Sequence, residues 1–335
     1  MKNHGPIARI LERVIAPMYF AVEQDFDAQA AIVTAQQHDE LPIFAICLYL
    51  AAVFWLPPRL EGTKPLSLRR TWALWNLALA LFSCCGAART VPTLVRAARE
   101  HGLRYTMCTD SAAWYLGPDH RPCGLWMTLF IFSKIPELLD TIFLVAQQKD
   151  VIFLHWFHHV TVLLYCWHAF TSTPAATGLW FAAMNYSVHS VMYLYYFLSI
   201  AGLRRLARPI APIITVVQIA QMAVGSGVTL LAARAHFAHA AGAPGAAACA
   251  GTPESYKLGL AMYSSYLVLF MMLFYANYLA PDAKHEVDCG CSARKAEAKK
   301  KYVMVCGVKS TRGAPFGDGA FASGGRPDGA SKKSS

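Results

Sequence analysis

Four histidines in two long apolar stretches are the side chains of this sequence best suited to chemistry. His155, His158 and His159 form an HxxHH box within FLHWFHHVTVLLYCW, and His189 follows in MNYSVHSVMYLYYF. At 3.6 residues per helical turn, the three histidines of the box lie within about 100° of arc. Neutral imidazole serves as a metal ligand, a general base and a nucleophile. The pattern therefore predicts either a metal site or a metal-free acid–base and nucleophilic site.

Further polar residues interrupt the same and neighbouring apolar stretches. They are Lys134, Glu137, Asp140 and Thr141 in SKIPELLDTIF, Asn185 one turn before His189, and Gln218 and Gln221 in VVQIAQMAVG. Helical spacing places each set on one face, with Asp140 on the flank of its set. Ionisable side chains inside a membrane are costly and mark functional sites. Two structural alternatives remain: the amides hold helices together, or Lys134 pairs with Glu137 or Asp140 only to fix packing.

The elements that position these residues are predicted to be membrane-spanning helices. Hydrophobic residues make up 56% of the 335 residues and charged residues 15%, against about 25% charged in soluble domains. The mean hydropathy is +0.34. A span needs about 20 apolar residues. The sequence predicts an all-α integral membrane protein with seven transmembrane helices, at 41–56, 71–88, 125–147, 151–170, 175–200, 209–232 and 256–279.

The predicted helices bring the polar residues to a similar depth. Counted from the nearer end of its helix at 1.5 Å per residue, His158 lies roughly 11 Å deep and His189 roughly 16 Å deep. Glu137 and Asp140 lie roughly 10–15 Å deep and Gln218 roughly 14 Å deep. Because four helices deliver polar groups to one layer, we expect an enclosed site there.

The basic residues predict the orientation in the membrane. Seven spans place the two termini on opposite sides, and residues 281–335 form a predicted disordered tail with 11 Lys and Arg residues. A cytosolic tail places 19 Lys and Arg residues on that side, about twice as many as on the other, although the opposite loop 89–124 holds five arginines. The domains are then a lumenal segment 1–40, a transmembrane domain 41–280 and this tail. Its end, Lys332-Lys333-Ser334-Ser335, is typical of a di-lysine signal for the endoplasmic reticulum.

The cysteines offer one predicted bridge and one rival nucleophile. The ten cysteines show no zinc-binding spacing. Cys249 lies on the same predicted side as Cys108 and Cys123, and two alternatives remain: a bridge from Cys249 to one of them, or no bridge. Cys166 shares the helix face of His155 but lies roughly 10 Å beyond His159. We interpret it as a residue that lines the site.

Four strings occur together and in order, and they carry a resemblance. These are Lys134-Ile-Pro-Glu137-Leu-Leu-Asp140-Thr141, the HxxHH box at 155–159, Asn185-x-x-Val-His189 with Met192-Tyr193-x-Tyr195-Tyr196, and Gln218-x-x-Gln221. With these strings, residues 40–280 resemble the ELO/ELOVL family of very-long-chain fatty acid elongases. The box, in LHWFHHVTVLLY, is more similar to the subgroup that acts on saturated and monounsaturated chains. The resemblance implies six of the seven helices in a closed barrel around an acyl tunnel, capped by bulky residues such as Trp167 or Trp180.

The resemblance also implies a reaction. Acyl-CoA and malonyl-CoA condense to 3-oxoacyl-CoA with release of CO2 and CoA, without a metal or another cofactor. A neutral imidazole suits this site because it attacks a thioester without the buried anion that a cysteine thiolate requires. Following the family, His158 is the expected acyl acceptor, His189 holds or activates the malonyl unit, and His155 and His159 orient these groups and transfer protons.

The remaining polar residues take supporting roles in this interpretation. Asn185 and Gln218 donate hydrogen bonds to the thioester or enolate oxygen, while Gln221, Lys134, Glu137, Asp140 and Thr141 brace the site. The phosphates of CoA would meet basic residues at the cytosolic end, which are Lys149, Arg204, Arg205, Arg208 and Lys284. The alternative for these five is ordinary positive charge on the cytosolic side.

The expected partners follow from the reaction class. They are membrane lipid, a ketoreductase, a dehydratase, an enoyl reductase and a second copy of the chain in a homo-oligomer. Nucleic acid is not expected, because the net charge of +10 is gathered in short loops and the tail. A desaturase or hydroxylase needs bound iron and further histidine boxes, although a single zinc ion remains an alternative. A receptor or transporter would not need the box beside a Lys-Glu-Asp face.

Overall fold

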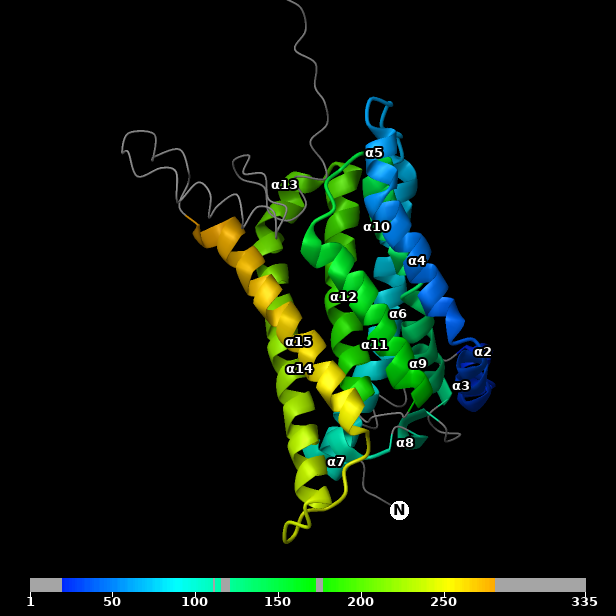
Figure 1. Ribbon diagram of the computed structural model, residues 1–335, viewed down its shortest axis with the longest axis vertical. Helices are drawn as coiled ribbons and strands as arrows, with labels where there is room; N and C mark the ends of the chain where they lie inside the picture. The colour runs from blue at the N-terminus through cyan, green and yellow to red at the C-terminus, as the bar shows by residue number, and fades with distance from the viewer. Residues whose placement is uncertain (1–19, 111, 116–120, 173–176, 281–335) are drawn as a thin grey trace, which may run out of the picture.

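The described part of the chain is helical throughout and contains no β-strand. The computed structural model describes residues 20–110, 112–115, 121–172 and 177–280 (Figure 1). In chain order the elements are α2 (Ala21–Gln24), α3 (Ala28–Gln37), α4 (Glu40–Phe54), α5 (Leu56–Leu60), α6 (Arg69–His101), α7 (Leu103–Cys108), α8 (Ala112–Tyr115), α9 (Arg121–Ser133), the 3-10 helix η3 (Pro136–Leu138), α10 (Leu139–Ala146), α11 (Phe153–Ser172), α12 (Thr177–Ala201), α13 (Arg204–Ala207), the 3-10 helix η4 (Arg208–Ile210), α14 (Ala211–Ala240), α15 (Pro253–Phe274) and the π-helix η5 (Tyr275–Leu279).

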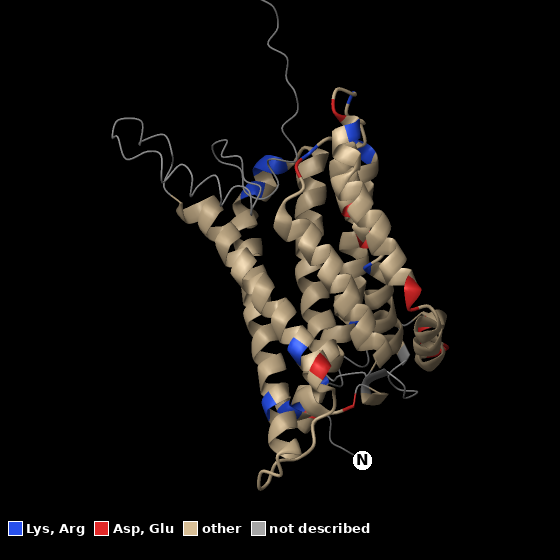
Figure 2. Ribbon diagram, viewed as in Figure 1, with Lys and Arg blue, Asp and Glu red and all other residues tan. Residues whose placement is uncertain are grey.

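The long helices run side by side along one axis of the molecule. Helices α5 and α13 lie at one end, which we name the α13 end, and α7 and α8 lie at the other, the α7 end (Figure 1). Lys and Arg gather at these two ends, and few charged positions lie between them (Figure 2). A charge-poor middle between two charged ends is the pattern expected of a bundle that crosses a lipid bilayer.

Three helices of the described chain are long and apolar enough to cross a membrane. They are α6, the continuous segment Arg204–Ala240 that ends with α14, and α15 with η5; α4 is a shorter apolar helix. Helices α11 and α12 carry the histidines, an asparagine and many tyrosines, which lower their hydropathy. The protein is thus an all-helical membrane protein, whereas the seven-span closed barrel stays a prediction.

Two of the predicted spans differ in detail from the helices. Helix α6 continues to His101 because Leu94 and Ala97 stay buried, so one face still enters the core beyond the apolar run that ends at 88. The third predicted span is interrupted, with η3 between α9 and α10. Pro136, the first residue of η3, accounts for the interruption, because proline has no N–H to donate and its ring clashes with the preceding turn. The interruption falls within the Lys134–Thr141 string.

Helix α12 packs most extensively against α6, which is far from it in the chain. Gly86 permits this contact, because a Cβ there would lie 2.5 Å from ring atoms of Tyr186. The Tyr186 ring is buried among Phe82 and Phe130, and its hydroxyl donates to the Trp126 carbonyl at 2.9 Å. This aromatic cluster joins α6, α9 and α12 next to the polar residues of α9 and α12.

Helix α15 packs against both α14 and α11. Gly225 of α14 faces the Tyr263 ring, and a Cβ at Gly225 would overlap that ring. Gly259 of α15 likewise faces Tyr165 of α11, and a Cβ at Gly259 would lie 2.8 Å from the Tyr165 hydroxyl oxygen. Small residues allow these helices to approach closely, as is typical of helices within membranes. The result places α15 beside the histidine box.

Two contacts fasten the chain near the α7 end. Glu23 is 1% exposed, accepts from Arg89 at 2.9 Å and from the Trp126 indole at 2.6 Å, and so joins α2 to α6 and α9. Burial favours a higher pKa for Glu23, but the hydrogen bonds from Arg89 and Trp126 outweigh it and hold the pKa below its ordinary value. Cys249 forms a disulfide with Cys108, which settles the alternative that the sequence left open.

The predicted tail 281–335, with Lys284 and the di-lysine end, lies outside the described residues, as do residues 1–19 of the predicted segment 1–40. These boundaries stay predictions.

Candidate active site

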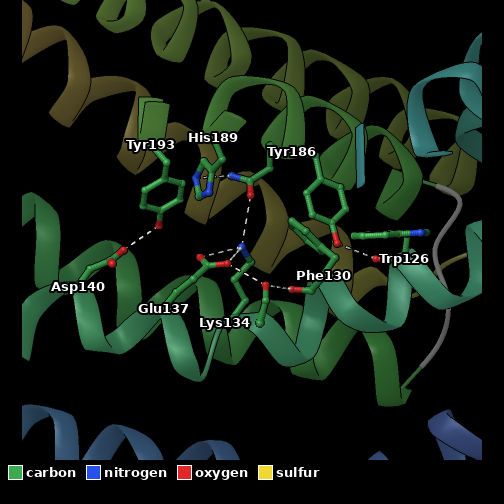
Figure 3. Close-up of polar contacts among 10 residues, drawn as sticks. Trp126, Phe130, Lys134, Glu137, Asp140, Tyr186, His189 and Tyr193 are labelled. Atoms are coloured by element: carbon green, nitrogen blue, oxygen red, sulfur yellow. Dashed lines mark hydrogen bonds and ion pairs between the residues drawn. The ribbon is translucent and has the colours of Figure 1, made fainter. Parts of the chain in front are cut away.

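A buried ion pair occupies the break between α9 and α10. Lys134 is 2% exposed and Glu137 4% exposed. The Lys134 ammonium donates to Glu137 Oε1 at 2.8 Å and to Oε2 at 2.9 Å, and Ser133 also donates to Oε1 at 2.8 Å (Figure 3). The ammonium also lies 4.4 Å from the centre of the Phe130 ring. Satisfied partners on both sides allow the two charges to stay in a low-dielectric interior.

The same ammonium reaches across to α12. Lys134 donates to Asn185 Oδ1 at 3.3 Å, and Asn185 Nδ2 lies 2.9 Å from His189 Nε2 (Figure 3). Because an ammonium only donates, its contact identifies the amide oxygen and turns the amide N–H groups toward the imidazole. His189 Nε2 must then accept, so a neutral His189 carries its proton on Nδ1. The chain from Glu137 to His189 therefore fixes one tautomer.

Asp140 belongs to a separate contact set. Its Oδ1 accepts from the Trp75 indole at 2.6 Å, and its Oδ2 accepts from the Tyr193 hydroxyl at 2.7 Å. Both carboxylate oxygens thus have neutral donors from α6 and α12. Of the two pairings left open by the sequence, Lys134 pairs with Glu137. Asp140 instead fixes Tyr193, which lies one turn beyond His189 on α12.

Thr141 holds the first histidine of the box. Thr141 is fully buried, and its hydroxyl lies 2.9 Å from the Tyr49 hydroxyl of α4 and 2.9 Å from His155 Nε2 of α11. The His155 and His159 rings are 4.7 Å apart, and the Tyr49 ring lies 6.1 Å from that of His159. Two histidines of the box therefore lie on the α4 and α10 side of α11.

His158 lies on a different side of α11. Its ring is 5.6 Å from that of His159 and 4.9 Å from the Tyr266 ring of α15. Its Nδ1 is buried and has no hydrogen-bond partner. His158 is close enough to His189, Lys134 and Glu137 for their charges to act on it. Charged and polar groups from η3, from the turn that precedes it and from α12 thus lie within electrostatic range of His158 on α11.

Helix α14 contributes less directly than expected. Gln218 Nε2 contacts the Met192 sulfur of α12 at 3.4 Å, and Gln221 is 7% exposed. Neither amide is hydrogen-bonded to a histidine in the described residues. Cys166 is buried in an apolar cluster of α9, α11 and α12.

The two tryptophans expected to cap a tunnel have different surroundings. Trp167 packs against Phe132 at 5.3 Å between ring centres, and its indole donates to Asp39 Oδ1 at 3.3 Å. The Trp180 indole donates to Thr106 Oγ1 of α7 at 3.0 Å. Of the two, Trp180 is the one that contacts the helix at the α7 end.

Basic residues of the predicted CoA set lie at the α13 end. The Lys149 ammonium lies 4.6 Å from the centre of the Trp72 ring, near the start of α6. Arg69 at the start of α6 donates to the Ile200 carbonyl near the end of α12 at 2.8 Å. The start of α6 therefore lies beside the end of α12, which α13 and η4 follow in the chain. Arg204, Arg205 and Arg208 occupy those two helices. Partial burial lowers the pKa of Lys149 to about 8.

In the described chain, no group of three or more His, Cys, Asp or Glu side chains lies in a metal-binding arrangement. The nearest imidazole pair, His155 and His159, has one nitrogen occupied by the Thr141 hydroxyl.

Sequence reasoning missed several residues around the histidines. Four residues contact these polar groups or fix a residue that does: Tyr49, Trp75, Thr161 and Tyr266. Aromatic and hydroxyl residues are common in apolar helices, so residue type alone gave no signal. These residues are identified only by the tertiary structure, which shows which helices lie next to the polar groups.

Comparison with known proteins gives consistent matches. Residues 34–286 match the model of the ELO family, described as the GNS1/SUR4 family. The chain is 44% identical over 287 residues to fatty acid elongase 3 of Trypanosoma brucei brucei, covering 79% of this chain and 91% of that protein. It is 42% identical over 240 residues to very long chain fatty acid elongase 6 of Drosophila melanogaster, covering 71% and 72%. It is 35% identical over 272 residues to very long chain fatty acid elongase 6 of Gallus gallus, covering 81% and 97%.

Proposed function

The chain belongs to the ELO (GNS1/SUR4) family of fatty acid elongases, and on that premise we propose that it catalyses the condensation step of fatty acid elongation. The reaction joins acyl-CoA and malonyl-CoA to give 3-oxoacyl-CoA, CO2 and CoA. The enzyme class is an acyltransferase, a 3-oxoacyl-CoA synthase. One observation carries the proposal: His158, whose buried Nδ1 has no hydrogen-bond partner, lies within electrostatic range of His189, a histidine whose tautomer is fixed.

The first step is transfer of the acyl group to His158. Its Nε2 attacks the thioester carbonyl carbon, the C–S bond breaks, and CoA leaves as a thiolate that takes up the proton that the imidazole loses from Nδ1. The product is an acyl-imidazole at His158. A neutral imidazole makes this attack without a buried anion in the resting site, which an apolar interior would penalise. The absence of a hydrogen bond to Nδ1 leaves the ring free of a competing partner.

The second step forms the new carbon–carbon bond. Malonyl-CoA loses CO2, and the resulting enolate carbon attacks the acyl carbonyl carbon. The bond from this carbon to Nε2 breaks, 3-oxoacyl-CoA forms, and His158 regains its ring proton from water. His189 is suited to the enolate oxygen because its Nε2 is occupied by Asn185 and its Nδ1–H is a donor. Lys134 and Glu137 act through Asn185 by holding its amide in the required orientation.

The polar set around His155 supports the same site. Thr141 holds His155, and Tyr49 holds Thr141, so His155 and His159 keep a fixed position next to His158. They orient the acyl-accepting imidazole and transfer protons. Gln218 reaches α12 through Met192 and would act at the thioester only after a local rearrangement.

We extend the proposal to the surroundings of the site. Seven spans, six of them in a closed barrel, would enclose an acyl tunnel that ends near Trp180, where α12 meets α7. The α13 end would face the cytosol, where Lys149, Arg204, Arg205 and Arg208 meet the phosphates of CoA. The protein would reside in the endoplasmic reticulum membrane, with the N-terminus lumenal and the C-terminus cytosolic. A ketoreductase, a dehydratase and an enoyl reductase would process its product, and a second copy of the chain would form a homo-oligomer.

The test is malonyl-CoA-dependent extension of a series of acyl-CoAs by purified protein in detergent. The wild type is expected to give 3-oxo products two carbons longer, with or without a chelator, and His158→Ala is expected to give none. The matched control is His168→Ala, which removes a histidine of the same helix whose Nδ1 is bonded to Ser172 at 3.0 Å. It is expected to keep activity.

Absence of product from every chain length would refute the proposal, as would activity that requires iron and oxygen in place of malonyl-CoA. Loss of activity on chelation would replace the metal-free mechanism with a metal-dependent one.

A further inference from the structure

The histidines of the site differ in what holds their rings. His155 is held by the Thr141 hydroxyl at 2.9 Å, and His189 is held by the Asn185 amide at 2.9 Å. His158 has no such contact, since its buried Nδ1 has no partner and no side chain of the described residues is hydrogen-bonded to its ring. The orientation of the His158 imidazole must therefore come from packing.

The packing partner on the α15 side is Tyr266. Its ring centre lies 4.9 Å from that of His158, with the two planes tilted by 57°. Tyr266 is 1% exposed and also lies 6.2 Å from the Phe157 ring. A buried tyrosine whose own position is fixed can restrict rotation of the imidazole about its Cβ–Cγ bond, because interior side chains are close-packed.

A hydroxyl pair fixes Tyr266. Its hydroxyl lies 2.5 Å from Thr161 Oγ1, and Thr161 Oγ1 lies 2.7 Å from the Phe157 carbonyl one turn earlier on α11. If Thr161 donates its single proton to that carbonyl, its oxygen accepts from Tyr266. The longer contact of the Tyr266 hydroxyl with the His158 carbonyl, at 3.2 Å, lies on the same side. Helix α15 is thereby attached to α11 within one turn of His158.

We infer that Tyr266, locked by Thr161, is a positioning residue that sets the orientation of the His158 imidazole for acyl transfer. This inference rests on the proposed function, since it concerns the first half of that reaction. Tyr266 lies in none of the strings on which the family resemblance rests, and Thr161 lies two residues beyond the HxxHH box. A displacement of about 1 Å in a reacting group can cost about 100-fold in rate. Loss of the Tyr266 ring is therefore expected to slow acyl transfer more than loss of the Tyr266 hydroxyl.

The experiment measures release of CoA from acyl-CoA in the absence of malonyl-CoA, by rapid mixing with purified protein. The wild type is expected to release one equivalent in a burst. Tyr266→Leu is expected to slow the burst about 30- to 100-fold with its amplitude kept, because the ring that orients His158 is lost. Tyr266→Phe keeps the ring and is expected to slow it only about 3- to 10-fold. Thr161→Val is expected to match Tyr266→Phe, and the double variant to be no slower than either, because both remove one shared contact.

The matched control is Tyr256→Phe. Tyr256 is a buried tyrosine of the same helix whose hydroxyl is bonded to the Ala250 carbonyl, about 15 Å along α15 from Tyr266. It is expected to leave the burst rate unchanged. The inference is overturned if Tyr266→Leu keeps the wild-type rate, if it loses amplitude without loss of rate, or if Tyr256→Phe slows the burst equally. A wild type that makes the elongated product without a burst would instead overturn the covalent step of the proposed function.

Discussion

Replacing one member of the Lys134–Glu137 pair should separate its contribution to stability from its contribution to the reaction. Glu137→Met removes three charge-assisted hydrogen bonds, two from Lys134 and one from Ser133, and leaves a cation that is 2% exposed. Removing one partner of a buried pair costs about 3–5 kcal/mol. Replacing both partners by apolar residues of similar volume is close to neutral, so Lys134→Met/Glu137→Met should regain most of the lost stability.

Activity should not return with stability. In the double variant, Asn185 has lost the donor that fixes its amide, and the tautomer of His189 is no longer set. We expect elongation per folded molecule to fall about 100-fold, as for a misplaced catalytic group. The assay compares thermal unfolding in one detergent with malonyl-CoA-dependent elongation, each corrected for the folded fraction.

The Arg89–Glu23 pair provides the matched control. It is also a largely buried pair, but it lies between α2, α6 and α9 and contacts Trp126, not the histidines. Arg89→Met/Glu23→Met should keep elongation near the wild-type level. If Lys134→Met/Glu137→Met did so as well, the pair would only fix packing and the proposed relay to His189 would be wrong. If Glu137→Met were as stable as the wild type, the reasoning from burial would fail.

Two further predictions concern the ends of the bundle. Partial burial lowers the pKa of Lys149 to about 8, so its charge is lost as the pH rises through that value. The KM for acyl-CoA should therefore increase between about pH 7 and about pH 9. Lys149→Arg should flatten this dependence, because arginine stays charged. A KM that does not change with pH in the wild type would exclude Lys149 from phosphate binding. Replacing both Cys108 and Cys249 with serine opens a disulfide between residues 141 apart and should lower stability by about 3–5 kcal/mol, with elongation by the folded protein kept. An unchanged unfolding temperature, with and without reductant, would contradict this.

Local spacing predicted which residues share a helix face. Lys134 with Glu137 and Asn185 with His189 are neighbours as expected, because residues three and four apart lie close together on a helix. The interruption at Pro136 was not expected, although proline is a known helix breaker, because the apolar pattern continues on both sides of it.

The histidine box shows the limit of such reasoning. Periodicity places His155, His158 and His159 within one arc, yet His155 and His159 face Thr141 and Tyr49, whereas His158 faces α15. An arc of about 100° is wide enough to meet two neighbouring helices. Which helix lies opposite each position depends on contacts between segments far apart in the chain.

The sequence by itself determined the all-helical membrane class, the family strings and the faces that carry chemistry, since these depend on composition and on a local helical period. Only the tertiary structure decided that Lys134 pairs with Glu137 and leaves Asp140 to Trp75 and Tyr193. It also decided which cysteine pairs with Cys249. The physical reason is that a partner is chosen by distance in space, and close packing of α6 against α12 and of α15 against α11 sets those distances.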